Sequence, residues 1–501
     1  MILSQEQAIL NGEIEFERLV RWVQQAGEQG RRIDLVEEQL FRSLLGLGKT
    51  LLQAYLAAQG TGDVGETFDR DGRTLHRLGA LHGRRYVSVF GELEVRRHVY
   101  GTREGQKLEV VPLDARVGLP EGDYSNLLRQ WDQAQCVRNS YEESRCTVEQ
   151  ILGLRQSVRA LEHMNRDMAA GVEASREQQP APPAKEEGPI LVLTADGKGV
   201  PMRRGEGEAA PEGRRKAGEK ANKKRMAVVG ACYTIEPFVR TARDVVDEVM
   251  REQAKARRPQ PIHKRARAEL TREVEGEGGV GEVNGKDVVF GWFREQCRRR
   301  NGDSSKVVVC LMDGERRLWK AAGRCFGGLV AAVVCVLDVF HMLERLWAAA
   351  HCFFPENSPE ARAFVAERLG RILEGEAGRV IGGLRQMGTK RGLRGAKLEQ
   401  LNKALNYLTN NLPHMRYDQY LAAGYPIGSG VAEGACRHLV KDRMELTGMR
   451  WTTDGAQAML DVRSMYLGDD WEDFNQFRIE QEMKRLYPYR DVVEQSYSNA
   501  A

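Results

Sequence analysis

Three observations make the mixed α/β class the fold class that the sequence predicts. Two apolar stretches, ILVLTADG at 190–197 and VVVCLMDG at 307–314, each indicate a buried strand that ends in Asp-Gly. A third, LVAAVVCVLDVF at 329–340, indicates another buried strand, and DVVFGWFREQCRRR at 287–300 indicates a helix before the second strand. Strands that are separated by one helix and then adjacent favour parallel or mixed pairing, so we expect an open α/β sheet rather than a barrel.

Size and composition exclude several classes of protein. A chain of 501 residues with 42% hydrophobic content can form several domains. No apolar run reaches the ~18 residues of a membrane helix, and the N-terminus carries acids where a signal peptide is basic, so we expect a cytoplasmic protein without membrane contact. Nine cysteines without a Cys-x-x-Cys pair argue against a disulfide framework and a zinc ribbon.

The first two regions, 1–79 and 80–121, are expected to be helical and a small antiparallel sheet. In the helical region an apolar spacing of three to four continues over 36–55, and Asp34 with Glu37 resembles a capping box. GLGKT at 46–50 resembles the end of a P-loop, but Ser43 occupies the first glycine position and the segment falls inside a helix, so we expect no nucleotide cofactor. The alternating stretches RRYVSVFG, ELEVRRHVYG and KLEVVPLD predict the strands.

Residues 122–172 predict two helices that are separated at Gly153, with Ser157 as the N-cap of the second. This pattern is compatible with a helix-turn-helix whose second helix could enter a major groove, where Arg155, Arg159 and Arg166 could contact DNA. A plain helical hairpin is the alternative. Residues 173–189 are rich in proline and charge and predict a linker.

The rest of the chain predicts an interrupted catalytic core. Residues 190–341 would form its first part, with basic inserts of unassigned role at 203–225 and 251–275. Residues 342–424 show no strand pattern and predict an all-helical insertion. Residues 425–470 return to the core, with a glycine-rich turn and Ser429 as N-cap, and 471–501 would form a C-terminal helix and tail.

Three acids in these segments indicate a site for divalent metal ions. Asp196 and Asp313 end two buried strands, and Glu433 lies on the helix after the glycine-rich turn. Hard divalent ions prefer oxygen ligands, and a pair of them can run phosphodiester cleavage, so we expect two Mg²⁺ or Mn²⁺ ions at these residues.

Each acid has an alternative interpretation. An Asp before Gly is often only a turn residue, and Glu445 could replace Glu433 as the third acid. Arg437 and Lys441, one and two turns beyond Glu433, could hold DNA phosphates, although an exposed basic helix face is the ordinary alternative.

Four motifs, TADGKGV, LMDGERRLW, LDVFHMLERLW and IGSGVAEGACRHLVKDRMELTGMRW, resemble the DDE transposases of the ISKra group of bacterial insertion sequences. The resemblance covers roughly residues 80–470 and implies an RNase H-like catalytic core with Asp196, Asp313 and Glu433 as its acidic triad. Asp338 and His341 match a C/D-x-x-H pattern similar to that of Mutator-like and hAT transposases, in which the His lies close to the scissile DNA. An Asp at a helix start beside a satisfied His is the alternative.

The expected function is therefore that of a DNA transposase. It would cleave a strand at the ends of its element and join the freed 3′-hydroxyl to target DNA, as a homodimer or higher oligomer that holds two ends together. The first alternative is an RNase H-like nuclease or resolvase without strand transfer. The second is a DNA-binding transposase derivative that is no longer catalytic, against which the presence of all three acids speaks.

Overall fold

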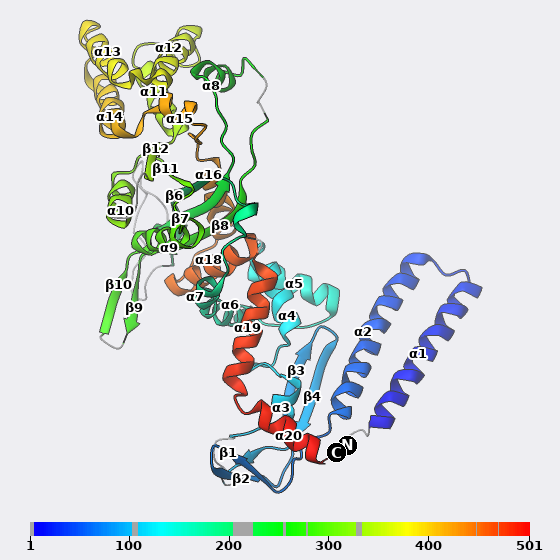
Figure 1. The fold of residues 1–501 in the computed structure, drawn as a ribbon. Helices are drawn as coiled ribbons and strands as arrows, with labels where there is room; N and C mark the ends of the chain where they lie inside the picture. Colours follow the sequence, from blue (N-terminus) through cyan, green and yellow to red (C-terminus); the bar gives the residue numbers. More distant parts are fainter. Residues whose placement is uncertain are drawn as a thin grey trace, which may run out of the picture. The chain divides into compact units, whose positions relative to one another are not determined.

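The computed structural model describes residues 5–102, 109–203, 224–253, 257–276, 279–326, 333–446, 448–468 and 470–500 (Figure 1). The chain divides into two compact units, residues 1–175 with 470–501 (unit 1) and residues 176–469 (unit 2). Helices and sheets occur in both units, and unit 2 contains a mixed five-stranded sheet, so the predicted mixed α/β class is confirmed. None of the helices among the described residues is both long and apolar enough to cross a bilayer.

Unit 1 begins with a helical hairpin of α1 (Gln5–Glu28) and α2 (Ile33–Ala58) (Figure 1). The predicted capping box is wrong, because α2 starts at Ile33 without a side-chain cap and Asp34 forms an ion pair with Arg32 at 2.6 Å. The region 1–79 also contains strands β1 (Thr67–Arg70) and β2 (Arg73–Arg77), which pair with the short β5 (Tyr100–Gly101).

The predicted β-hairpin at 80–100 is confirmed as β3 (His82–Ser88) and β4 (Gly91–Arg97). The third predicted strand, KLEVVPLD, is wrong in its described part. Only Val110 bridges to Tyr100, and Pro112 opens the helix α3 (Pro112–Val117). Proline is suited to the first turn of a helix because its missing N–H has no partner there anyway.

Three helices follow and pack on one another: α4 (Asn126–Cys136), α5 (Tyr141–Leu152) and α6 (Val158–Ala170). The predicted break and cap are confirmed. Gly153 ends α5 with φ 72°, a left-handed conformation that favours glycine, and the Ser157 side chain accepts a hydrogen bond from the N–H of Ala160. The predicted linker 173–189 starts as a helix, α7 (Val172–Gln178), and includes a short 3₁₀ turn, Ala184–Glu186.

The C-terminal helices α19 (Trp471–Leu486) and α20 (Arg490–Ala500) belong to unit 1. Arg129 of α4 forms a buried ion pair with Glu482 of α19 at 3.3 Å, and the Tyr487 hydroxyl donates to the carbonyl of Leu119 at 2.6 Å. The segment expected as a C-terminal helix and tail is therefore part of the core of unit 1.

The sheet of unit 2 has the order β12-β11-β6-β7-β8. Strands β6 (Ile190–Pro201), β7 (Lys224–Ile235) and β8 (Ile262–Leu270) are antiparallel, whereas β11 (Val307–Met312) runs parallel to β6 and to β12 (Val333–Leu337). Side chains of β6 and β11 alternate between two apolar clusters, one with α9 (Gly285–Arg300) and α10 (Arg316–Phe326) and one with the helices after β12. The central strands are thus buried on both faces, which is why they appear as continuous apolar runs.

The basic insert at 251–275 contains β8 as an edge strand, followed by β9 (Arg272–Gly276) paired with β10 (Gly279–Val283). Two of its charged residues are buried. Arg267 and Glu269 form a buried ion pair at 2.7 Å, and the Gln457 side chain of α18 (Thr453–Leu467) bonds the backbone of Ala268 and Leu270. The other basic insert, 203–225, lies mostly outside the described residues.

The region expected to be a helical insertion, 342–424, contains helices and loops throughout (Figure 1). Its elements, beginning just before it, are α11 (Val339–Ala350), α12 (Pro359–Arg371), the π-helix η2 (Ile372–Glu376), α13 (Ala377–Lys390), α14 (Gly395–Asn411), η3 (Leu412–His414) and α15 (Tyr417–Ala422). The helix α8 (Ala242–Val249) packs against α12. The chain then returns to the sheet as α16 (Gly430–Ala435), the π-helix η4 (Cys436–Lys441) and α17 (Asp442–Met444).

Candidate functional site

At one end of the parallel half of the sheet, three aspartates occupy the same level, each directly after the paired residues of its strand. Met312 of β11 lies opposite Ala195 of β6 and opposite Leu337 of β12. The next residue in each case is an aspartate, Asp196, Asp313 or Asp338. Because neighbouring strands lie about 4.8 Å apart, the register places three carboxyl groups side by side.

Asp196 is half-buried, and local contacts orient its carboxylate. Its Oδ1 accepts a hydrogen bond from the N–H of Gly197 at 2.6 Å, and its Oδ2 lies 3.4 Å from the donating thiol of Cys436 in η4. Burial and the charge of Asp196 raise the pKa of the Cys436 thiol, so that this group stays protonated and acts as a donor. The contact ties the helix that follows Glu433 to the end of β6.

Asp313 is also half-buried, on a turn that only glycine can complete. Its Oδ1 accepts from the N–H of Glu315 at 2.8 Å, and Gly314 has φ 91°. A Cβ at Gly314 would lie 2.7 Å from the Tyr407 hydroxyl and 2.8 Å from Leu337. The Tyr407 hydroxyl donates to the carbonyl oxygen of Asp313, so α14 holds this turn in place.

Asp338 is fully buried at the start of α11, and four donors surround its carboxylate. Oδ1 accepts from the N–H groups of Phe340 at 2.8 Å and His341 at 2.9 Å, and lies 3.2 Å from Nδ1 of His341. Oδ2 accepts from the N–H of Ser429. A carboxylate offers about four lone-pair sites, so these contacts saturate it. They also lower its pKa against the opposing effect of burial.

Asp338 stabilises the protonated form of His341. The hydrogen bond to Asp338 raises the pKa of His341 to about 9, and the charges of Asp338, Asp313 and Glu344 act in the same direction. At neutral pH the ring is therefore an imidazolium, held through Nδ1 and close enough to Asp313 to feel its charge.

Glu433 in α16 completes the group of acids. It is exposed, yet partial desolvation and the negative charges of Asp338 and Asp196 raise its pKa, while His341 opposes the increase. Desolvation and the charge of Asp196 likewise raise the pKa of Asp313. Each shift shows that these carboxyl groups lie within one another's field, a like-charge cluster that a cation would relieve.

One combination of these residues satisfies the geometry of a metal site. Ligand atoms of Asp338, His341 and Glu433 lie within 4.8 Å of one another, so this cluster could hold a metal ion. Because Asp338 is saturated by its four donors and His341 is protonated, an ion there would have to displace existing partners. Glu433 is the exposed member of this cluster, and its pKa also responds to the charge of Asp196.

The alternative third acid, Glu445, lies elsewhere. Its carboxylate pairs with Lys224 of β7 at 2.6 Å. Ser429 does not cap α16 with its side chain as predicted, and instead its backbone N–H bonds Asp338. The structure thus brings Glu433 toward Asp196 and Asp338 and pairs Glu445 with a cation.

The basic residues of the prediction are all exposed. Arg437 and Lys441 both lie in the π-helix η4, and Arg437 pairs with Asp442 at 3.6 Å. In unit 1, Arg155 lies in the turn before α6 and pairs with Glu149 at 3.1 Å, while Arg159 and Arg166 point outward from α6. Their exposure leaves them available to phosphates.

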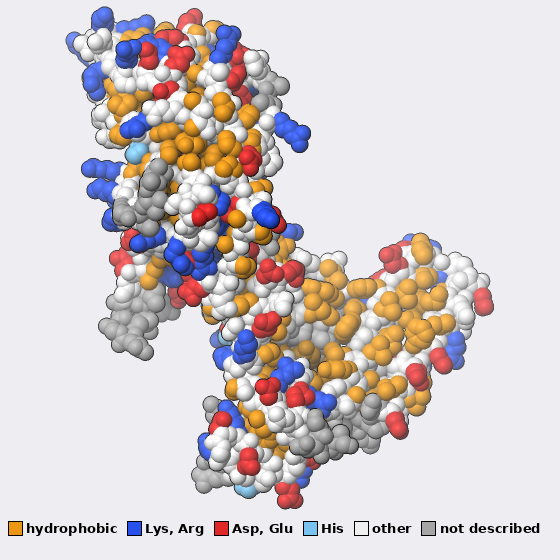
Figure 2. All heavy atoms as spheres, viewed as in Figure 1, with side chains coloured by type: hydrophobic (Ala, Val, Ile, Leu, Met, Phe, Trp, Pro, Cys, Tyr) orange, Lys and Arg blue, Asp and Glu red, His pale blue; other side chains and the backbone are white. Residues whose placement is uncertain are grey.

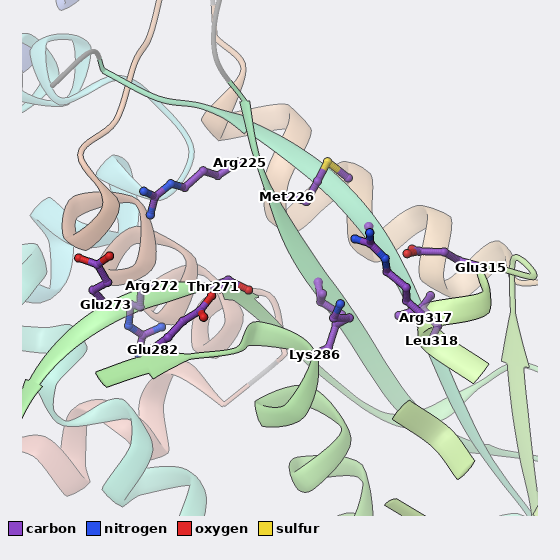
Figure 3. Close-up of a pocket in the computed structure, with 12 residues that line it drawn as sticks. Arg225, Met226, Thr271, Arg272, Glu273, Glu282, Lys286, Glu315, Arg317 and Leu318 are labelled. Carbon is purple, nitrogen blue, oxygen red and sulfur yellow. The ribbon is translucent and has the colours of Figure 1, made fainter. Parts of the chain in front are cut away.

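A cavity of about 550 Å³ adjoins the acids (Figure 3). Gly197, which follows Asp196, and Glu315, two residues beyond Asp313, both line it. Four cations surround the cavity from four different elements, with three glutamates among them: Arg225, Arg272, Lys286 and Arg317, with Glu273, Glu282 and Glu315 (Figure 3).

Sequence reasoning missed Cys436 and Tyr407. Cys436 follows Glu433 by three residues, so helical spacing could have placed both on one face. Tyr407 lies 94 residues from Asp313 along the chain, and only the folded insertion brings them together.

No protein-family model and no curated protein matches this chain.

Proposed function

We propose that this chain is a DNA transposase of the DDE type, which cuts DNA at the ends of an insertion sequence and joins those ends to target DNA. The observation that carries the proposal is the strand register that sets Asp196 beside Asp313 at the end of the parallel half-sheet, together with the charge of Asp196 that raises the pKa of both Asp313 and Glu433. Such a cluster of carboxylates is the ligand set that Mg²⁺ or Mn²⁺ requires.

The fold supports this choice. An antiparallel half of three strands joined to a parallel half of two, with helices packed on both faces, is compatible with an RNase H-like core interrupted by a helical insertion. The four motifs that resemble ISKra-group transposases include Asp196, Asp313, Asp338, His341 and Glu433, and all five lie in this one region of unit 2.

In this proposal Asp196, Asp313 and Glu433 would hold two divalent ions. Asp196 and Asp313 each use Oδ1 for a backbone hydrogen bond of their own turn, which fixes the carboxylate planes, and Glu433 approaches from the helix. Bound there, a pair of ions would activate the attacking oxygen and stabilise the leaving oxygen of a phosphodiester.

The other residues would position the DNA. The imidazolium of His341, anchored by Asp338, can donate a hydrogen bond to a phosphate oxygen beside Asp313 and Glu433. Arg437 and Lys441 can bind phosphates along the strand, and the basic side of the neighbouring cavity can receive it. No covalent enzyme intermediate is needed, because water and then the freed 3′-hydroxyl serve as nucleophiles.

Unit 1 would supply the recognition of DNA ends. The helices α5 and α6 would recognise element ends as a helix-turn-helix, with Arg155, Arg159 and Arg166 on the DNA. We propose a cytoplasmic protein whose two copies hold two DNA ends.

The test is a strand-transfer assay with DNA that carries both boundaries of the element and either Mg²⁺ or Mn²⁺. Wild type should cleave the ends and join them to a target plasmid, whereas Asp196→Asn, Asp313→Asn and Glu433→Gln should each lose both steps. Full activity in any of the three variants would remove that residue from the site.

Glu445→Gln is the matched control, since it removes a carboxylate from the same stretch that pairs with Lys224. It should keep full activity. Metal-dependent cleavage without joined products would indicate the nuclease or resolvase alternative, and DNA binding without cleavage by wild type would indicate the non-catalytic derivative.

A further inference from the structure

The α1–α2 hairpin exposes an unusual amount of apolar surface. Almost half of the exposed large hydrophobic side chains among the described residues lie in these two helices. Figure 2 shows hydrophobic side chains along both helices on the face in view. Scattered apolar residues are normal on a surface, but a concentration of this kind marks an interaction site.

The two helices contact each other through one regular seam, which we call the inner seam. The least exposed positions follow a spacing of four and three in both helices: Ala8, Gly12, Glu15, Leu19, Trp22 and Ala26 in α1, and Val36, Leu40, Ser43, Leu47, Thr50 and Ala54 in α2. This heptad pattern is that of an antiparallel pair of helices packed along their length. The hairpin is therefore complete without the remaining apolar side chains.

A second seam, the outer seam, follows one position after the inner one. Its large apolar members have exposed fractions between 40% and 56% and are Ile9, Phe16, Val20 and Val23 in α1 and Phe41, Leu44, Leu51 and Tyr55 in α2. Its remaining positions are Glu13, Gly27, Glu37 and Gly48. One residue further along a helix is a rotation of about 100°. Because the two helices run in opposite directions, equal rotations from the inner seam bring both outer seams to the same face of the hairpin.

The other sides of α2 already have partners in unit 1. Arg42 donates to the carbonyls of Gln150 and Ile151 at 2.8 Å, and Leu56 lies with Leu93 around a second cavity next to β4. These residues lie on the side of α2 away from α1. On the outer-seam face the ring of Phe90 packs against α2 at Gly48, whereas the large outer-seam side chains remain exposed.

From this face we infer that the outer seam of one chain packs against the outer seam of a second copy, forming a four-helix bundle. A helix with two heptad seams is typical of a bundle, in which each helix has two neighbours. A two-fold interface uses the same patch on both chains, and a flat apolar face can serve both roles.

The size of the face fits a stable dimer. A helix of 26 residues is about 39 Å long, and two helices side by side are about 20 Å wide, so the face covers roughly 800 Å². A standard stable interface buries about 800 Å² on each partner.

Charge argues against an anionic lipid surface as the occupant. Helices that lie on such membranes carry Lys and Arg on their polar face, whereas α1 contains five Glu and two Arg. A second copy needs no basic residues there.

The experiment is sedimentation velocity of the full chain without DNA over a wide concentration range. Wild type should sediment as a dimer of the 56.4 kDa chain, and Phe16→Glu combined with Leu44→Glu should raise the dissociation constant at least about a hundredfold. The matched control is Leu10→Glu with Leu35→Glu, two exposed apolar residues of the same helices outside the outer seam, which should leave the dimer intact.

A monomeric wild type would overturn the inference, as would a dimer that survives the outer-seam substitutions. Hydrogen exchange of wild type gives an answer free of folding effects, because protection over 9–23 and 41–55 should rise with concentration. Unchanged protection in a dimeric sample would place the interface elsewhere. The inference is independent of the proposed catalysis, and an inactive Asp313→Asn chain should still dimerise.

Discussion

Asp313 and Asp338 follow neighbouring parallel strands at the same level, yet they differ in burial, in hydrogen-bond donors and in the direction of their pKa shifts. Asp313 is half-buried, uses one oxygen for its own turn, and has a raised pKa because desolvation and Asp196 oppose its charge. Asp338 is fully buried, has four donors, and has a lowered pKa. The first arrangement leaves a carboxylate in need of a cation, and the second uses a carboxylate as a structural anchor.

Asp338 contacts two helices at once, α11 and the start of α16. Asp338 starts α11, orients His341, and holds the N–H of Ser429 directly before α16. The N–H of Val339 also donates to the carbonyl of Ile427 at 2.8 Å. Asp338 thereby positions Glu433, which lies on α16. The comparison predicts that losing Asp313 affects the reaction, whereas losing Asp338 affects the fold first.

The largest effect is expected for Asp313→Asn. Strand cleavage should fall by about a thousandfold or more, because the amide cannot replace an ionised ligand. The folded chain should be as stable as wild type or more so, since a raised pKa means that the folded state disfavours this charge. Cleavage assays and thermal unfolding of the same sample would check both, and a large loss of stability would contradict the assignment.

Asp338→Ala, in contrast to Asp313→Asn, should lower the stability of the fold. Loss of the helix cap and of the partners for buried N–H groups should cost about 3 kcal/mol of unfolding free energy. Activity should fall because Glu433 and His341 lose their positions. Chemical denaturation measures the cost. If Asp338→Ala were stable but inactive, Asp338 would be a metal ligand rather than an anchor.

The titration of His341 tests the anchor directly. In wild type its ring should titrate near pH 9, and in Asp338→Asn it should titrate much closer to the ordinary 6.5. The stabilisation that this pair gives the fold is complete below pH 6.5 and is lost as the pH rises through about 9. Imidazole proton shifts in NMR would record the change.

Metal affinity should depend on pH through the other carboxylates. The pKa values of Asp313 and Glu433 are raised, so protons compete with the ion above the ordinary values of 3.8 and 4.5. Affinity for Mn²⁺ should therefore increase as the pH rises above these ordinary pKa values, by up to about tenfold per pH unit for each proton released. Calorimetric titration would show it, and affinity that does not vary with pH would contradict the site.

The smallest effect is expected for Glu445→Gln. Its ion pair with Lys224 is partly exposed, so stability should change by less than about 1 kcal/mol. Cleavage and metal affinity should match wild type. A loss as large as that of Glu433→Gln would exchange the two glutamates in the proposal.

The sequence predicted best those strands of the sheet that are buried on both faces. β6 and β11 are central strands, and their apolar runs ending in Asp-Gly located both acids. β8 is an edge strand whose Arg267 and Glu269 neutralise each other inside the protein, so its composition resembles a solvated loop. A hydrophobicity pattern cannot detect a charge that finds its partner only after folding.

The same limit applies to the site and to the hairpin. The saturation of Asp338 depends on Ser429, 91 residues away, and no local pattern encodes it. In α2 the sequence showed one apolar spacing, whereas the structure separates it into an inner seam with Leu40 and Leu47 and an outer seam with Leu44 and Leu51. The two seams differ in the exposed fraction of their side chains, which the sequence does not give.

The turn at Gly314 has a consequence for how this protein can be altered. The Tyr407 hydroxyl on α14 holds the carbonyl of Asp313, and Asn411 on the same helix accepts a hydrogen bond from Trp319 of α10 at 2.8 Å. The helical insertion is therefore not a removable module. A shortened variant of this protein that lacks the insertion would need another group to hold the turn at Asp313.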